Sequence, residues 1–190
     1  MLDVRAARPE EFETVMNFYY DLTDRMMGSA YEPGWEKDVY PTRGFVRQSI
    51  ENGELYVGFL SGEAPACAEA AEQEQAPACV MVINHETTDG YETVNWPVKA
   101  APEAVLVIHA LGVHPGYQGL GLGKRLVAAA IDICRGKGAR AIRLDVLGNN
   151  LPAQKLYPSM GFQYITTLKL FYEDTGLTDF LLYELPLSDV

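Results

Sequence analysis

Four glycines mark the segment of this chain whose residue types and spacing are best suited to chemistry. Gly116, Gly119, Gly121 and Gly123 follow an apolar, β-branched run over residues 105–108, which is typical of a buried strand. An amphipathic helical pattern follows the loop. A strand, a glycine-rich loop and a helix N-terminus together form an anion site, because unpaired N–H groups and the positive end of the helix dipole converge there. The segment therefore predicts a phosphorylated ligand.

The spacing of these glycines excludes two common phosphate-binding loops. With Gly123 and Lys124 as its G-K pair, a nucleoside-triphosphate loop would need glycine at Gln118 and a hydroxyl residue at Arg125. A dinucleotide loop, G-x-G-x-x-G, would need glycine at Lys124 or at Leu126. Neither pattern is met, so the ligand is expected to be a different phosphorylated compound.

The pattern that remains is Gln118-x-x-Gly121-x-Gly123, preceded by Val113-x-Pro115. It resembles the acyl-CoA loop of the GNAT N-acetyltransferase superfamily, Q/R-x-x-G-x-G/A after a strand. A glycine loop alone is a weak signal. The V-x-P before it and a second motif downstream make the resemblance specific.

The second motif covers residues 150–162 and resembles the family's N-x-x-A-x-x-L-Y-x-x-x-G-F segment. Its residue types also predict a helix without reference to the family. Asn150 is a good N-cap, an apolar face includes Tyr157, and Gly161 ends the pattern. Pro158 within the pattern predicts a bend or a tightened last turn. The resemblance covers residues 105–162, with the flanks matching more loosely.

The resemblance implies acetyl transfer from acetyl-CoA, as co-substrate, to an amine. In the family, backbone groups at the distorted end of the cofactor strand hold the pantetheine and the thioester, and by position these belong to Leu111 and Val113. The loop amides would bind the pyrophosphate. The residues expected to bind the cofactor are Leu111, Val113, Gln118, Gly119, Gly121, Gly123, Lys124 and Asn150. No metal site is predicted.

Two side chains are candidates for proton transfer. Tyr157 matches the family's tyrosine that protonates the departing CoA sulfur, and the alternative is a core aromatic on a helix face. His109 stands two residues before Leu111, where many family members carry a glutamate that acts as general base, often through water. Histidine titrates near neutral pH and can therefore act as a general base; the alternative is a buried histidine whose ring nitrogens are simply hydrogen-bonded in the core. Strand alternation places His109 on the same side as Leu111 and Val113 unless a bulge intervenes.

The sequence gives weaker evidence about the amine that accepts the acetyl group. The net charge of −11 argues against nucleic acid as a partner, and it could steer a cationic amine, although many acidic proteins have no such role. Between the first two predicted helices, Tyr31, Trp35 and Tyr40 could form a substrate wall, as the corresponding family region does. The alternative is that these aromatics pack the loop onto the core.

Residues 1–190 are expected to form a single domain, because no linker or repeat divides the chain. No signal peptide or membrane span is found, and three cysteines without metal-ligand spacing fit a reducing cytoplasm. Strands are predicted over residues 4–7, 54–60, 79–84, 105–113, 140–147, 164–172 and 179–187, and helices over 9–26, 42–52, the segment after the glycine loop and 150–161. Residues 61–78 read as an exposed insertion.

This order of elements predicts an α/β fold, and the resemblance implies a three-layer GNAT-like sandwich. Its single sheet should be mixed and mostly antiparallel, with about seven strands and about four helices. Two function classes stay open. One is an N-acetyltransferase acting on a primary amine of a small molecule or peptide, and the other is a non-catalytic acyl-CoA-binding sensor or partner module. Homodimerisation is also left open.

Overall fold

The computed structural model describes residues 1–29, 33–60, 76–117 and 119–187. Tyr31, Gln118 and the core of the predicted insertion, residues 61–75, therefore lie outside the described residues. The strands are β1 (Leu2–Ala6), β2 (Leu55–Leu60), β3 (Cys79–Asn84), β4 (Val105–Val113), β5 (Ala141–Leu147), β6 (Gln163–Tyr172) and β7 (Gly176–Pro186). The α-helices are α1 (Phe12–Met26), α2 (Arg43–Glu51), α3 (Leu122–Gly136) and α4 (Leu151–Ser159).

The strands form one sheet in the order β1-β2-β3-β4-β5-β7-β6. Within the described ranges, β4 and β5 pair in parallel and the other pairings are antiparallel. Parallel neighbours need a crossover, and α3 supplies it between β4 and β5, as the glycine loop followed by a helix predicted. The predicted mixed, mostly antiparallel sheet with four helices is confirmed.

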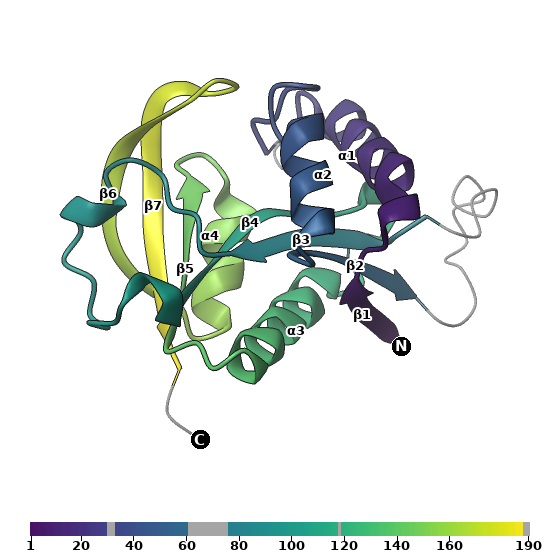
Figure 1. Cartoon of the computed structure of the whole chain (residues 1–190). Coiled ribbons are helices and arrows are strands. Elements are labelled where there is room, and N and C mark those ends of the chain that lie inside the picture. The colour runs from purple at the N-terminus through teal and green to yellow at the C-terminus, as the bar shows by residue number, and fades with distance from the viewer. Residues whose placement is uncertain (30–32, 61–75, 118, 188–190) are drawn as a thin grey trace.

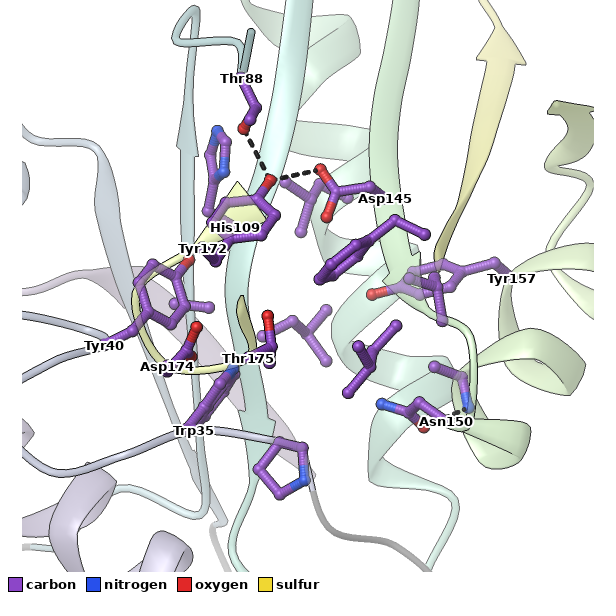
Figure 2. Close-up of a pocket in the computed structure, with 18 of the residues that line it drawn as sticks. Trp35, Tyr40, Thr88, His109, Asp145, Asn150, Tyr157, Tyr172, Asp174 and Thr175 are labelled. Carbon is purple, nitrogen blue, oxygen red and sulfur yellow. Dashed lines mark hydrogen bonds between the residues drawn. The ribbon is translucent and has the colours of Figure 1, made fainter. Parts of the chain in front are cut away.

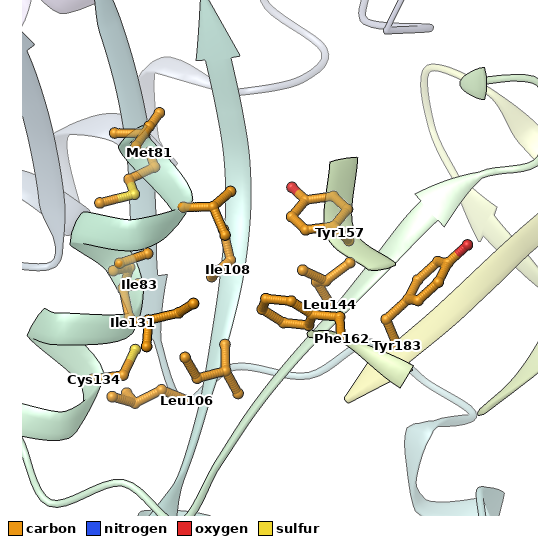
Figure 3. Packing of buried hydrophobic residues seen from close by; sticks show 14 of the residues in the cluster. Met81, Ile83, Leu106, Ile108, Ile131, Cys134, Leu144, Tyr157, Phe162 and Tyr183 are labelled. Carbon is orange, nitrogen blue, oxygen red and sulfur yellow. The ribbon is translucent and has the colours of Figure 1, made fainter. Parts of the chain in front are cut away.

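Helices cover both faces of this sheet (Figure 1). Strand β3 shows why, because it is apolar on both sides: Val80 and Val82 pack toward α1 and α2, whereas Met81 and Ile83 pack toward α3. A strand whose two faces are both buried must lie inside a sandwich of three layers. Figure 3 shows the α3 side of this core, where side chains of β3, β4 and β5 meet α3 and α4.

Two distortions of β4 create the space for a site. The first is a separation from β5: their pairing runs only from Val105 and Ala141 to Val107 and Arg143, so the two strands diverge beyond that point. The second is a bulge at Ala110, whose φ of 47° is positive, and whose carbonyl oxygen accepts a hydrogen bond of 2.9 Å from the buried Tyr19 hydroxyl of α1. The bulge shifts the register of β4 against β3 by one residue.

The bulge corrects one expectation from strand alternation. His109 was predicted to share a face with Leu111 and Val113. Its ring instead lies 6.4 Å from the ring of Phe45 on α2, whereas Leu111 and Val113 pack against the core under α3. An extra residue in a strand reverses the alternation beyond it, so His109 and Leu111 approach the space between β4 and β5 from opposite faces of the sheet.

Candidate active site

Two hollows meet in the space between β4 and β5. The inner cavity, of about 430 Å³, lies between the diverging ends of β4 and β5, the α1–α2 loop and the β6–β7 turn. The loop groove, of about 510 Å³, runs from the end of β4 along the glycine loop to the start of α3. The two hollows share a set of lining residues from three segments of the chain: Pro33, Trp35, Leu111, Asn150, Pro152 and Leu156. A ligand lying in the loop groove can therefore reach into the inner cavity.

The loop groove ends at the N-terminus of α3. Gly121 is the N-cap residue of this helix, with a φ of 70°, and as a glycine it has no side chain to cap the helix. The first-turn amides of Leu122, Gly123 and Lys124 precede the first helical hydrogen bond, which Arg125 donates to Gly121. These uncapped donors, with the helix dipole behind them, can bind a pyrophosphate.

The open edge of β4 forms the floor between the two hollows. The backbone N–H of His114 bonds to Ala78, which precedes β3, and Gly112 is paired with Val80 of β3. Since backbone polar groups alternate along a strand, those of Leu111 and Val113 point to the opposite edge, where β5 has diverged. Their N–H and C=O groups can therefore pair with the amide groups of an extended ligand, as the resemblance implied.

The glycine loop has a support that the sequence did not reveal. The Nδ1 atom of His114 accepts a hydrogen bond of 3.1 Å from the Gly116 amide, so its Nε2 carries the proton and donates to Asp21 of α1 over 2.6 Å. Arg25 holds Asp21 in turn, with an N–O distance of 2.9 Å. This chain of contacts fixes the start of the loop against α1. The partner lies 93 residues away in the sequence, so no local signal could indicate it.

Tyr157 reaches the inner cavity from α4. Asn150 begins this helix by accepting a hydrogen bond of 3.1 Å from the Ala153 amide, as its N-cap role predicted. The Tyr157 ring packs edge-on against Phe162 at 5.4 Å, and Figure 2 shows its hydroxyl directed into the cavity. Burial is the main cause that raises the pKa of Tyr157, and the nearby charge of Asp145 adds to it. The phenol is therefore protonated at neutral pH and can donate a proton.

His109 lines the inner cavity from β4. Its Nε2 lies 3.2 Å from the backbone oxygen of Glu86, an acceptor, so the contact is a hydrogen bond when Nε2 carries the proton. Nδ1 is then the basic atom. Burial lowers the pKa of His109, and the Glu86 carbonyl opposes that shift in part. The ring is therefore neutral near pH 7, the state that a general base requires.

A buried polar network also lines the inner cavity, and sequence reasoning missed it. Asp145 of β5 accepts hydrogen bonds on Oδ2 from the hydroxyls of Tyr91, at 2.7 Å, and Tyr172, at 3.2 Å. Tyr172 also contacts the Thr88 hydroxyl at 2.6 Å. Burial raises the pKa of Asp145, and the two tyrosine donors oppose that shift. The sequence offered one sign of this network, the carboxylate of Asp145 within an otherwise apolar predicted strand. A carboxylate at such a position is equally typical of a side chain that faces solvent.

The aromatic loop between α1 and α2 forms another wall of this cavity. Trp35 and Tyr40 both line it, while Tyr31 lies outside the described residues. Their rings are 6.0 Å apart, and Trp35 also packs edge-on against Tyr19 at 5.6 Å. The two residues thus pack the loop onto the core and face the cavity at once. Their predicted role in binding the acceptor stays a prediction.

Across the described ranges, no group of three or more metal-ligating side chains is close enough to hold a metal ion. None of the helices within those ranges is long and apolar enough to cross a membrane.

Comparison with known proteins agrees with this geometry. The model of the acetyltransferase (GNAT) family matches residues 16–162, which include both motifs and most of the cavity wall. The chain belongs to the GNAT family. Streptothricin acetyltransferase of Streptomyces lavendulae is 36% identical over 176 residues, covering 92% of this chain and 88% of the relative.

Other GNAT proteins match over shorter stretches or by fold alone. Mycothiol acetyltransferase of Beutenbergia cavernae is 38% identical over 86 residues, which are 45% of this chain but only 29% of that protein. A crystal structure of Arabidopsis thaliana NAA60 in complex with acetyl-CoA superposes with a TM-score of 0.71 at 15% identity, covering 98% of this chain and 99% of that one. This last likeness concerns the fold.

Proposed function

We propose that this protein transfers an acetyl group from acetyl-CoA to a primary amine. The observation that carries the proposal is the junction of the two hollows at the open edge of β4. The loop groove offers uncapped amides for a pyrophosphate, and the inner cavity offers Tyr157 and His109. A thioester whose phosphates lie in the groove would then present its carbonyl carbon beside both proton-transfer groups.

The residues have separate tasks in the reaction. An alkyl ammonium has a pKa of about 10, so it must lose a proton before it can attack. His109 would accept this proton on Nδ1, directly or through one water. The amine nitrogen then bonds to the carbonyl carbon, and a backbone N–H on the open edge of β4 stabilises the developing oxyanion. The amine nitrogen loses its second proton, the carbon–sulfur bond breaks, and the Tyr157 hydroxyl protonates the departing thiolate. Solvent carries the nitrogen's proton away and returns one to the Tyr157 phenolate, so that the amide, free CoA thiol and restored phenol are the products.

A non-catalytic acyl-CoA-binding module would need the loop groove but not the inner cavity. The cavity is continuous with the groove and holds a protonated phenol and a neutral imidazole. Groups with shifted pKa values gather at catalytic sites, so this arrangement favours turnover. The similarity to streptothricin acetyltransferase along most of both chains supports a small-molecule acceptor over a peptide.

Three further expectations belong to this proposal. The chain is expected to act as a single domain without a nucleic-acid partner. A cytoplasmic location fits the free, buried thiols of Cys79 and Cys134. Light scattering tests whether the chain forms a homodimer.

The experiment that tests the proposal is an amine panel with release of free CoA thiol as the readout, accompanied by calorimetry of acetyl-CoA binding. Amine-dependent thiol release supports acetyl transfer. Binding of acetyl-CoA without turnover on any amine would support the non-catalytic alternative, and absence of binding would refute both.

A further inference from the structure

The charges around the inner cavity are unbalanced. Three carboxylates line it: Glu86 follows β3, Asp145 lies on β5, and Asp174 lies in the turn between β6 and β7. Among the described residues that line the cavity, none is a lysine or an arginine. A cavity with one sign of charge concentrates ligands of the other sign, so a cationic ligand is favoured.

Asp145 leaves part of its charge available to such a ligand. Both tyrosine hydroxyls donate to its Oδ2 atom. Figure 2 shows the second carboxylate oxygen directed toward the cavity. Burying a carboxylate is costly unless its oxygens are satisfied, and a cation in the cavity would satisfy this one.

A second group of acceptors lies across the cavity from Tyr157. Asp174 is close to the rings of Trp35 and Tyr40, and Figure 2 shows these three on the side away from Tyr157. Beside them, the Thr175 hydroxyl oxygen is buried and has no hydrogen-bond partner among the described residues. An ammonium group placed here would donate to Asp174 and Thr175 and lie against aromatic faces, which attract cations.

The α1–α2 loop and the β6–β7 turn cover the inner cavity. Gly34 of the α1–α2 loop sits so close to β5 and to the β6–β7 turn that a Cβ atom on it would lie 2.8 Å from Leu147 and 3.0 Å from Thr175. The loop and the turn therefore meet over the cavity. A folded protein presenting its N-terminus would have to separate them, whereas a small molecule fits beneath.

We propose that the acceptor is a small molecule with two cationic groups. This inference rests on the proposed acetyl transfer and deepens it. The amine that reacts must be neutral when it attacks, so it cannot balance the carboxylates at that moment. A second cation, held by Asp174 and Thr175 against Trp35 and Tyr40, keeps its charge throughout and directs the reacting amine toward Tyr157.

The test compares α,ω-diamines of four to eight carbons with matched 1-aminoalkanes and amino alcohols, using thiol release by the intact chain. A hydrogen bond to a charged group contributes enough that the best diamine should exceed its matched monoamine in kcat/KM by roughly ten- to hundredfold. Asp174→Asn should reduce this ratio toward one. Asp179→Asn is the matched control, because Asp179 lies on β7 and pairs with Lys169 at 3.1 Å, outside the cavity wall, and it should preserve the ratio.

Equal kcat/KM values for diamines and monoamines would overturn the inference while leaving acetyl transfer in place, and so would a ratio that Asp174→Asn does not change. Preferred acetylation of a peptide N-terminus would also overturn it. If no amine is acetylated, calorimetry of diamines against the CoA-loaded protein decides the matter: failure of every diamine to bind refutes the dication site. Failure of acetyl-CoA itself to bind refutes the proposed function instead.

Discussion

Gly123 gives the sharpest test of the pyrophosphate site, because one substitution should move stability and cofactor affinity in opposite directions. Gly123 is the second residue of α3, within its uncapped first turn. Gly123→Asp places a carboxylate where the cofactor's pyrophosphate is expected. A negative charge at a helix N-terminus stabilises the helix by about 0.3–1 kcal/mol, which offsets the crowding of a new side chain at this position. The variant should therefore fold and melt no lower than the parent.

The loss of affinity follows from Coulomb's law. Two unit charges about 4 Å apart repel by about 4 kcal/mol near a protein surface, which corresponds to roughly a thousandfold in Kd. A pyrophosphate carries more than one negative charge, so its repulsion by Asp at this position should exceed this value. Calorimetric titration with acetyl-CoA measures the change, and thermal melting measures the stability.

Gly123→Asn is the matched control, since it has the same shape without the charge. A Cβ atom at this position would lie 3.3 Å from Leu156 Cδ2, so both variants carry the same crowding. The asparagine variant should lose far less affinity than the aspartate variant. Equal losses in the two variants would show that crowding alone acts there, and unchanged affinity in a folded Gly123→Asp would remove the pyrophosphate from this loop.

Three further predictions concern proton transfer and loop support. Tyr157→Phe should lower kcat by roughly a hundred- to ten-thousand-fold with little change in acetyl-CoA affinity, and unaffected turnover would make Tyr157 a packing residue. Burial lowers the pKa of His109, and its neutral form is the base, so kcat/KM should fall as the pH drops through a midpoint below 6.5. His109→Ala should remove this acidic limb of the pH profile, and a limb that persists in the variant would assign the base to another group. His114→Ala should weaken acetyl-CoA binding by roughly fivefold or more, as loss of a net hydrogen bond of about 1 kcal/mol implies, without removing the His109 limb; unaltered binding would contradict its support of the loop.

The parts of the site that could be predicted from the sequence are those with local causes. An N-cap at Asn150 and a glycine loop before a helix each depend on neighbouring residues, and both are found. The helix from residue 42 is likewise capped by the Thr42 hydroxyl, which accepts from the Phe45 amide at 3.0 Å. Strand and helix order followed from the same local patterns.

The parts that could not be predicted depend on contacts between distant segments. Ala110 gives no sign of a positive φ, because alanine rarely adopts one; the bulge is held by Tyr19 on α1. The Asp145 network joins three segments of the chain, namely the β3–β4 connection, β5 and β6, so no local pattern indicates it. The sequence thus indicated how the cofactor could bind, and the tertiary structure added the groups that face the acceptor.

The most direct test of acetyl transfer follows the acetyl group itself. Isotope-labelled acetyl-CoA is incubated with the protein and each member of the amine panel, and mass spectrometry identifies the products. The account predicts an N-acetylated amine that carries the label, formed in equal amount with free CoA and formed more slowly by Tyr157→Phe. Binding of acetyl-CoA with no labelled amine and no free CoA would contradict it and would make the chain an acyl-CoA-binding module.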